Sequence, residues 1–513
     1  MPEKRYVIAI DAGTTGTRSA VVDRDGRIVS FAYRTNKKYF PAPGWVEQDP
    51  MDIWQNVRST LKEATENCKI DLREIASAGI TNQRETLVVW DRLTGRPLYN
   101  AIVWQDKRTS SRIRAIDEDF VDIIMKSTGL RPDAYFSASK IQWLLENVEG
   151  LRSRMLNGEA AFGTVDSWII WNLTSRRDTA TLEKGKFVTD HSNASRTMLY
   201  DISRLRWNPD LLDLFGGIAE SSLPEVISSG SMDGYGYISD NAATMFGGYE
   251  IPITSDLGDQ QSALFGQGCF EPGDVKATYG TGTFVLANAG TEIPKSSRSL
   301  LRTIFYSLSD DEMNYALEGS ILASGSALRW LQNGLRLFRS EREIEEAATR
   351  LKSNEGVYFV PAFSGLGSPY WDQDARGLFI GLTERATSDH IARSVLESEV
   401  YMTTDVIRAM EEETGKRITK IRCDGGGSKS DFLMQFQADI SGAEVNVPEI
   451  TETTVLGTAY LSGFVSGLWE SRQEIRELWR LGKIYRPTIS SEERELKYMG
   501  WKEAVRRSMA WRP

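Results

Sequence analysis

The sequence of 513 residues contains few cysteines and few histidines. Its three cysteines, Cys68, Cys269 and Cys423, lie far apart and form no C-x-x-C motif, so we expect neither a disulfide framework nor a zinc site. The two histidines, His191 and His390, argue against histidine-based catalysis or metal binding. Proton transfer is therefore expected to fall to carboxylates.

Long hydrophobic runs and excess positive charge are also missing. No segment reaches the roughly 18 consecutive apolar residues that a membrane span needs, and the apolar run after the N-terminus is too short for a signal peptide. With 61 basic against 71 acidic residues, the net charge is -10, which disfavours general binding to nucleic acid or to anionic membranes. We expect a cytoplasmic protein without a membrane or nucleic-acid partner. Its length predicts two large domains.

A glycine- and threonine-rich stretch, Asp11 to Arg18, lies between two short apolar runs near the N-terminus. Its glycines allow the backbone to approach a ligand closely, Thr14 and Thr15 offer hydroxyls, and Arg18 offers a fixed cationic fork, so it is a candidate phosphate grip. Because residues 18–23 continue as a strand rather than a helix, a Walker P-loop and a Rossmann fingerprint are both disfavoured. An ordinary turn rich in these residues is the alternative.

Further polar clusters, and a second glycine–threonine turn, occur later in the chain. Polar clusters at 81–86 and 104–108 follow predicted strands, where α/β proteins place ligands, although solvated turns have the same composition. A second strand–turn–strand unit surrounds Gly280-Thr281-Gly282, and a glycine turn at 424–430 precedes a predicted helix over 431–440. We predict a duplicated organisation, with domains at 1–253 and 254–513.

The two glycine–threonine turns and the glycine turn at 424–430 could together bind a nucleoside triphosphate, because backbone N–H groups bind phosphates and acidic residues bind Mg²⁺. Phosphoryl transfer then requires little more than a base for the acceptor hydroxyl. Asp259, which follows Gly258 in a polar run between a strand and a helix, is the candidate base, and Asp11 is the candidate metal ligand. A helix cap is the alternative role for Asp259.

Several ordered segments resemble the FGGY family of carbohydrate kinases, within the actin-like ATPase superfamily, over nearly the whole chain. The most specific are Gly79-Ile-Thr-Asn-Gln-Arg-Glu-Thr86, Tyr99-Asn-Ala-Ile-Val-Trp-Gln105, Asp190-His-Ser-Asn-Ala-Ser-Arg-Thr-Met198, Gly258-Asp-Gln-Gln261, Tyr279-Gly-Thr-Gly282 and Asn314-Tyr-Ala-Leu-Glu-Gly319. The resemblance implies an α/β fold with two actin-like (ribonuclease H-like) ATPase domains around a central cleft. It also implies ATP-dependent phosphorylation of glycerol to sn-glycerol 3-phosphate, with Mg²⁺.

The resemblance also implies the site residues. Those matching the polyol-binding positions are Arg84, Glu85, Trp104, Tyr135, Asp259, Gln260 and Phe284, with Asp259 as general base. Those matching the nucleotide-binding positions are Thr14, Thr15, Arg18, Thr281, Gly325, Arg329, Gly426 and Ser430, and Asp11 matches a residue that positions Mg²⁺, through water.

Some residues depart from the family pattern: Ala12, Gly16, Arg329 and Ser430 replace Gln, Ser, Gln and Asn. Three alternatives therefore stay open, namely a kinase for another small polyol or a ketose, an actin-like ATPase, and a catalytically lapsed kinase with a regulatory role. A homodimer is the expected assembly.

Overall fold

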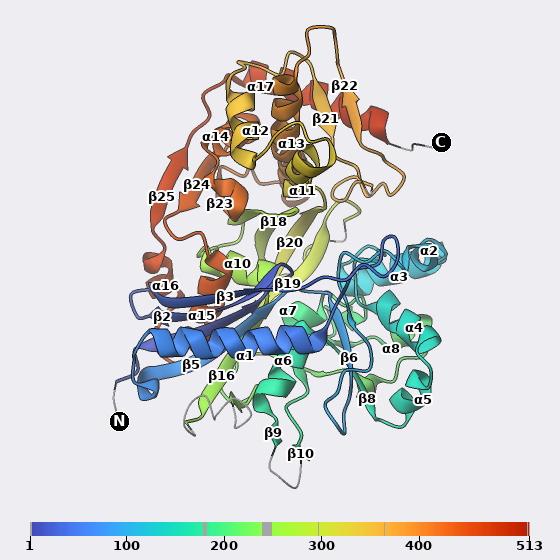
Figure 1. Cartoon of the computed structure of the whole chain (residues 1–513), viewed down its shortest axis with the longest axis vertical. Helices are drawn as coiled ribbons and strands as arrows, with labels where there is room; N and C mark the ends of the chain where they lie inside the picture. The colour runs from blue at the N-terminus through green and yellow to red at the C-terminus, as the bar shows by residue number, and fades with distance from the viewer. Residues whose placement is uncertain are drawn as a thin grey trace.

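The computed structural model describes residues 3–177, 182–238, 249–295, 297–363, 365–509 and 511. Two large sheets, each flanked by helices, lie one above the other along the longest axis of the molecule (Figure 1). The predicted α/β class is confirmed. None of the helices in the described part of the chain is long and apolar enough to cross a membrane.

The first sheet has the strand order β15-β16-β5-β1-β2-β3. Its strands are β1 (Tyr6–Ala12), β2 (Gly16–Asp23), β3 (Ile28–Thr35), β5 (Ile75–Asn82), β15 (Tyr237–Ile238) and β16 (Ile251–Gly258). The first three form an antiparallel meander, while β5 runs parallel to β1 and β16 parallel to β5. Helix α1 (Pro50–Asn67) buries Ile53, Trp54, Val57 and Leu61, as its apolar spacing predicts.

The second sheet has the order β19-β20-β18-β17-β23-β24-β25. Its strands are β17 (Val275–Tyr279), β18 (Thr283–Gly290), β19 (Leu301–Ser307), β20 (Met313–Ile321), β23 (Lys420–Asp424), β24 (Glu444–Pro448) and β25 (Leu481–Tyr485). The antiparallel hairpin β17–β18 has β23 parallel beside it, just as the hairpin β1–β2 has β5. The predicted second strand–turn–strand unit is therefore present.

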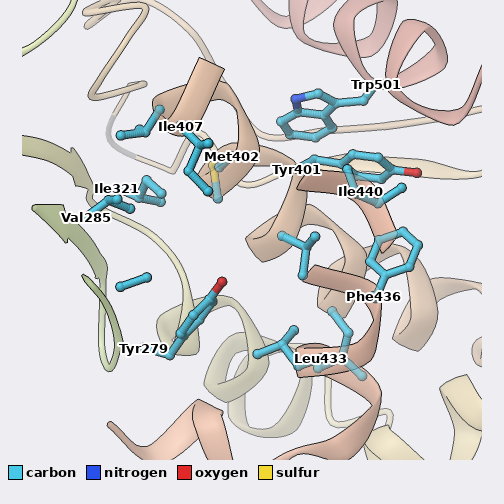
Figure 2. Close-up of a cluster of buried hydrophobic side chains, with 14 of the residues drawn as sticks. Tyr279, Val285, Ile321, Tyr401, Met402, Ile407, Leu433, Phe436, Ile440 and Trp501 are labelled. Atoms are coloured by element: carbon cyan, nitrogen blue, oxygen red, sulfur yellow. The ribbon is translucent and has the colours of Figure 1, made fainter. Parts of the chain in front are cut away.

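Large side chains fill the core between this sheet and its helices. These helices are α11 (Gly325–Arg329), α12 (Glu341–Thr349), α13 (Ser388–Thr414), α14 (Asp431–Ser441) and α17 (Ser491–Ser508). Figure 2 shows Tyr279 below and Tyr401 and Trp501 above in this core, with Phe436 and Ile440 projecting from α14. The rings of Tyr401 and Trp501 stack with centroids 5.4 Å apart, which anchors the C-terminal helix to the long helix α13.

Two helices connect the sheets. Helix α10 (Asp259–Gly266) follows β16 of the first sheet and contacts β17 and β18 of the second, whereas α15 (Thr453–Val465) follows β24 of the second sheet and packs on β1, β5 and β16. The two helices cross closely because Gly266 and Gly457 lie at the contact, where an added Cβ would collide with backbone of the other helix.

Smaller elements complete the chain. A four-stranded sheet, β4-β7-β6-β8, is formed by Glu47–Gln48, Ala101–Ile102, Leu87–Asp91 and Ala160–Thr164. The two-stranded pairs are β9 (Arg176–Arg177) with β10 (Leu182–Glu183), β11 (Val188–Asp190) with β14 (Glu225–Ile227), β12 (Tyr200–Asp201) with β13 (Arg206–Trp207), and β21 (Tyr358–Val360) with β22 (Leu378–Ile380). The other helices are α2 (Ser110–Arg114), α3 (Glu118–Thr128), α4 (Ala138–Asn147), α5 (Leu151–Leu156), α6 (Val165–Thr174), α7 (His191–Ala194), α8 (Pro209–Leu214) and α16 (Arg472–Leu478).

The structure differs from the pattern-based reading at one helix. The apolar spacing over 110–127 indicates one helix, but α2 ends at Arg114 and α3 begins at Glu118. Asp117 caps α3 by accepting a hydrogen bond from the backbone N–H of Asp119, which starts a new helix there. The predicted domain division after residue 253 stays a prediction; β16, which spans it, pairs within the first sheet.

Candidate active site

A cavity of about 220 Å³ opens between the two sheets, at the turns of the two glycine–threonine hairpins. It brings together most of the predicted site residues: Asp11, Thr14, Thr15, Arg18, Arg84, Glu85, Trp104, Tyr135, Asp259, Gln260, Thr281 and Phe284. These side chains come from elements that are distant in the sequence, because the carboxyl ends of β1, β5 and β16 meet at one edge of the first sheet.

The first hairpin supplies a buried carboxylate and a cation. Arg18 Nη1 lies 2.9 Å from Asp11 Oδ2 and 3.8 Å from Glu452 Oε2. Burial raises the pKa of Asp11, and the nearby Arg18 offsets part of that increase. Since the guanidinium of Arg18 remains partly exposed toward the cavity, it can contact an anion there as well as Asp11.

Three aromatic rings form one wall of the cavity. The Trp104 ring meets Tyr135 at a centroid distance of 5.5 Å and Phe284 at 6.1 Å, both edge to face. Trp104 Nε1 donates a hydrogen bond of 2.8 Å to the hydroxyl of Thr14. This bond ties the aromatic wall to the first hairpin and leaves the ring faces for the carbon atoms of a small ligand.

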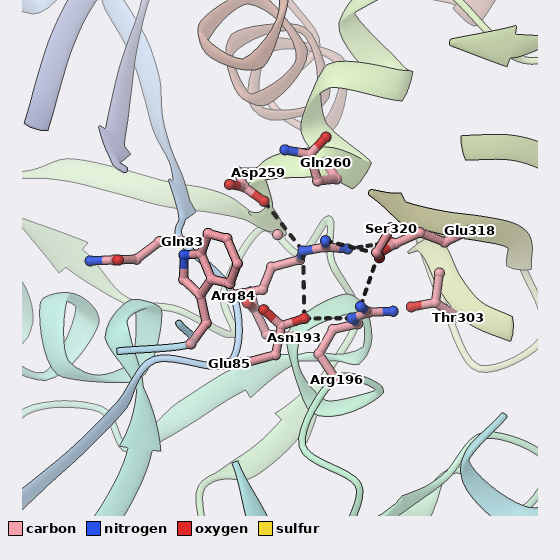
Figure 3. A network of polar contacts seen from close by, with 12 residues as sticks. Gln83, Arg84, Glu85, Asn193, Arg196, Asp259, Gln260, Thr303, Glu318 and Ser320 are labelled. Carbon is pink, nitrogen blue, oxygen red and sulfur yellow. Dashed lines mark hydrogen bonds and ion pairs between the residues drawn. The ribbon is translucent and has the colours of Figure 1, made fainter. Parts of the chain in front are cut away.

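A buried ionic network holds Arg84 at the base of the cavity (Figure 3). Arg84 Nη1 and Nη2 donate to the two carboxylate oxygens of Glu318 at 2.6 and 3.1 Å. Arg196 donates to Glu318 at 2.9 Å and to Glu85 at 2.7 Å. Burial alone would raise the pKa of Glu318, but Arg196 and Arg84 hold it at about 2. Charges removed from water need such pairing, so Arg84 is fixed before any ligand binds.

Asp259 lies on the cavity side of this network. Its Oδ1 is 3.3 Å from Arg84 Nε, and its side chain is 26% exposed. Burial raises its pKa, Arg84 lowers it in part, and Asp11 raises it further. Gly258 occupies the N-cap position of α10, so the alternative that Asp259 caps this helix is not what the structure shows. A carboxylate with a raised pKa that faces a cleft is suited to accept a proton.

Glycine at 258 is required by the approach of Arg84. A Cβ at this position would lie 2.6 Å from Arg84 Cδ and 2.7 Å from its Cγ. A larger residue would push the guanidinium away from Asp259 and Glu318, which gives the Gly-Asp-Gln-Gln segment a steric reason.

Some residues that hold or line the site were not predicted individually, among them Arg196, Glu318 and Lys276 around it and Lys38 and Thr454 in the cavity lining. Arg196 and Glu318 lie within the segments 190–198 and 314–319, which carried the family resemblance, so the signal was present. Lys276 is a fully buried lysine in strand β17, next to Val275 and Ala277. Its Nζ donates to Gln260 Oε1 at 2.5 Å and to Thr278 Oγ1 at 2.8 Å, and burial lowers its pKa to about 8. Lys276 thus orients the amide of Gln260.

The remaining predicted nucleotide residues do not line the cavity itself. Gly325 begins α11, and its N–H donates to the carbonyl of Gly280. Gly426 has open space around it, since a Cβ there would meet nothing within 4 Å. Ser430 caps α14 and donates to Glu345 at 2.6 Å, and Arg329 is exposed on α11.

The carboxylates of the cavity limit how a metal ion can be held. No group of three or more His, Cys, Asp or Glu that could bind a metal occurs among the described residues. Mg²⁺ is commonly bound through one or two carboxylates together with substrate phosphates and water. Asp11, buried in the first glycine–threonine hairpin, fits that mode and does not fit a cage made of protein alone.

Comparison with known proteins finds one family in both halves of the chain. The profile of the N-terminal domain of the FGGY family of carbohydrate kinases matches residues 6–266, and that of the C-terminal domain matches residues 275–465. A protein named glycerol kinase from Thermococcus gammatolerans is 49% identical over 508 residues, covering 99% of each chain. Glycerol kinase 2 from Thermotoga maritima is 48% identical over 508 residues, with the same coverage.

Solved structures agree on the fold. The crystal structure of Plasmodium falciparum glycerol kinase with ADP is 34% identical, has a TM-score of 0.88 and covers 100% of both chains. A ligand-bound xylulose kinase from Lactobacillus acidophilus, 22% identical with a TM-score of 0.83, covers 98% of this chain and 97% of its own and shows the fold alone. The predicted arrangement of two actin-like halves around a cleft is confirmed.

Proposed function

The chain belongs to the FGGY family of carbohydrate kinases, and we propose that it transfers the γ-phosphoryl group of ATP to glycerol, giving sn-glycerol 3-phosphate and ADP. Full-length relatives at 48–49% identity carry the name glycerol kinase. The observation that carries the proposal is the cavity itself, in which a carboxylate, a fixed guanidinium and an aromatic wall lie beside two glycine–threonine hairpins.

The cavity suits a small polyol. Glycerol has three hydroxyls and little apolar surface, so its recognition requires fixed polar partners and a few apolar walls. Arg84 and Gln260 are held in place by Glu318 and Lys276. In this proposal Arg84, Glu85, Tyr135, Asp259 and Gln260 bind the hydroxyls, while Trp104 and Phe284 pack on the carbon chain.

The transfer step needs one base. The oxygen of a primary hydroxyl forms a bond to the γ-phosphorus, the bond from that phosphorus to the β,γ-bridging oxygen breaks, and ADP leaves with the electron pair. Asp259 accepts the hydroxyl proton as the new bond forms. Arg84 keeps Asp259 aimed at the substrate and limits its basicity, because the two lie 3.3 Å apart.

The phosphates are assigned to the two hairpins. Thr14, Thr15 and Arg18 would contact them from the first sheet and Thr281 from the second, with Gly325, Arg329, Gly426 and Ser430 around the nucleotide. Mg²⁺ would be held by Asp11, through water, and by phosphate oxygens, where it neutralises phosphate charge. A homodimer in the cytoplasm is the proposed state of the protein, and light scattering on the purified chain tests the dimer.

An assay of ADP release across glycerol, erythritol, xylulose and no acceptor tests the activity. We expect glycerol to give the highest kcat/KM, since the cavity is small. Preference for erythritol or xylulose would indicate another sugar or polyol kinase. Steady ATP hydrolysis without any acceptor would indicate an actin-like ATPase, and glycerol binding without transfer would indicate a lapsed kinase.

A further inference from the structure

A second cavity, of about 250 Å³, opens between the two halves of the chain. Among its described lining residues, four side chains are cationic and one is a carboxylate: Lys107, Arg114, Arg131 and Arg376 against Asp133. The whole chain carries a net charge of -10. The cavity therefore concentrates positive charge on a protein that is negative overall, which is the pattern of an anion site.

The positive charges in this cavity are poorly neutralised. Lys107 Nζ lies 3.4 Å from Asp133 Oδ1. Arg376 donates to the backbone carbonyls of Gln373 and Ala375, and carbonyls carry no net charge. Arg114 forms no ion pair with any residue that the structure describes.

The charge of Arg131 is also poorly neutralised. Among the described residues it donates one long bond, 3.4 Å, to the carbonyl of Arg298, and burial together with the nearby Arg298 charge lowers its pKa. An anion would relieve this repulsion.

We propose that this second cavity binds a phosphate-bearing small molecule. Guanidinium groups match phosphate oxygens with paired, charge-assisted hydrogen bonds. The volume lies just under the range of about 300–1,000 Å³ for drug-sized ligands, so the occupant is a small metabolite. Leu322, Phe363 and Trp371 line the same cavity and would pack on the carbon skeleton of a phosphate ester.

The second cavity is connected to the first through Asp133. Asp133 Oδ1 accepts a hydrogen bond of 2.9 Å from the N–H of Tyr135, whose side chain lines the first cavity. Asp133 Oδ2 accepts one of 3.4 Å from Gln373, in the other half of the chain. An anion that draws Lys107 away from Asp133 changes the restraint on Tyr135, so occupancy would alter the KM for glycerol.

Isothermal titration of the full chain with inorganic phosphate and, separately, with glucose 6-phosphate tests the proposal. Both titrations are run with glycerol and a non-hydrolysable ATP analogue at saturation, so that the first cavity is filled. We expect saturable binding that each of Arg131→Gln and Arg376→Gln weakens about tenfold, the loss expected for one charge-assisted hydrogen bond. Arg114→Gln is the third variant. Because Arg114 is exposed, this substitution should have little effect on folding.

Arg206→Gln, an exposed arginine on β13, is the matched control and should bind like the wild type. Tighter binding of glucose 6-phosphate than of phosphate identifies an ester as the ligand, and equal binding identifies the phosphate group alone. The proposal is overturned if neither probe saturates, or if the three cavity variants bind as tightly as Arg206→Gln. Both titrations are repeated without glycerol and the ATP analogue, and binding seen only in these repeats would also overturn the proposal, because the anion would then occupy the hairpins.

Discussion

At the scale of single residues, Asp259 is the group whose chemistry decides the proposed reaction. Asp259→Asn removes the proton acceptor and keeps the shape of the side chain, so kcat should fall about 10²- to 10⁴-fold while the KM for glycerol changes much less. Steady-state kinetics with varied glycerol measures both. Because burial raises the pKa of Asp259 in the free protein, the acid limb of kcat/KM in the wild type should lie above the usual carboxylate range.

Asp213→Asn, an exposed carboxylate on α8, is the control for this substitution and should leave kcat and its pH profile unchanged. An equal, modest loss in kcat and in glycerol affinity for Asp259→Asn would mean that Asp259 only binds the substrate.

Lys276 is a positioning residue in this interpretation. Lys276→Met removes the donor that holds Gln260, so the KM for glycerol should rise about tenfold, as expected for one hydrogen bond to a charged group, with a smaller change in kcat. Lys352→Met, at an exposed position, is the control. A fall in kcat with unchanged KM would instead place Lys276 in the transfer step.

The same lysine predicts a pH dependence of stability. Its pKa is lowered from 10.5 to about 8 in the folded protein, so between these values the unfolded chain binds more protons than the folded one. Stability of the wild type should therefore rise with pH over this window relative to Lys276→Met. Urea unfolding of both proteins at pH values across the window measures the difference, and parallel curves would contradict the lowered pKa.

Single residues of the site could be predicted from the sequence only where the signal is local. The hairpin residues Asp11 and Thr281 could be predicted because a turn between two strands is local. The partner of Arg84 could not, since Glu318 lies 234 residues away and is joined to it only by the fold. Lys276 could not be singled out, because a lysine in a short strand is usually exposed, and its burial is known only once its neighbours in the fold are known.

At the scale of elements, the crossing of α10 and α15 is a close contact between the helices that connect the two sheets. Gly457→Ala should lower the free energy of unfolding by about 1–3 kcal/mol or more, because the added methyl would collide with the carbonyl of Ser262 and move α15. Thermal and urea unfolding measure the loss. Gly426→Ala, where a Cβ meets nothing within 4 Å, is the matched control for stability.

This pair of glycine substitutions also separates folding from binding. If Gly426 contacts the nucleotide as proposed, Gly426→Ala should keep the unfolding temperature of the wild type and weaken the binding of ATP. Unchanged stability of Gly457→Ala would show that the helices can separate without cost, and the close crossing would then have no structural role.

Helices and strands could be predicted where residues close together in the sequence define them. Both hairpins and α1 follow from strand and helix periodicity, and they form as expected. The break between α2 and α3 was missed because the apolar spacing continues through it, while the capping bond of Asp117 depends on a backbone geometry that periodicity does not report.

At the scale of the whole molecule, the two halves are joined firmly at the base of the cavity and loosely at its mouth. Arg84 and Arg196 from the first half share Glu318 of β20 in the second half. At the mouth, Arg18 and Glu452 are 3.8 Å apart and partly exposed, so that ion pair contributes little. This distribution of contacts favours rotation about the base rather than separation of the halves.

We therefore expect the mouth to close when glycerol and a non-hydrolysable ATP analogue bind together. A compact chain of this length has a radius of gyration of about 24 Å, and small-angle scattering should show a decrease with both ligands and a smaller one with glycerol alone. Asp259→Asn should still close, because binding does not require the base. Closure excludes water from the γ-phosphate, so the wild type should hydrolyse little ATP without an acceptor. Scattering curves that coincide with and without ligands would show instead that the hairpins already hold their phosphate-binding positions, and water would then have to be excluded by the substrate itself.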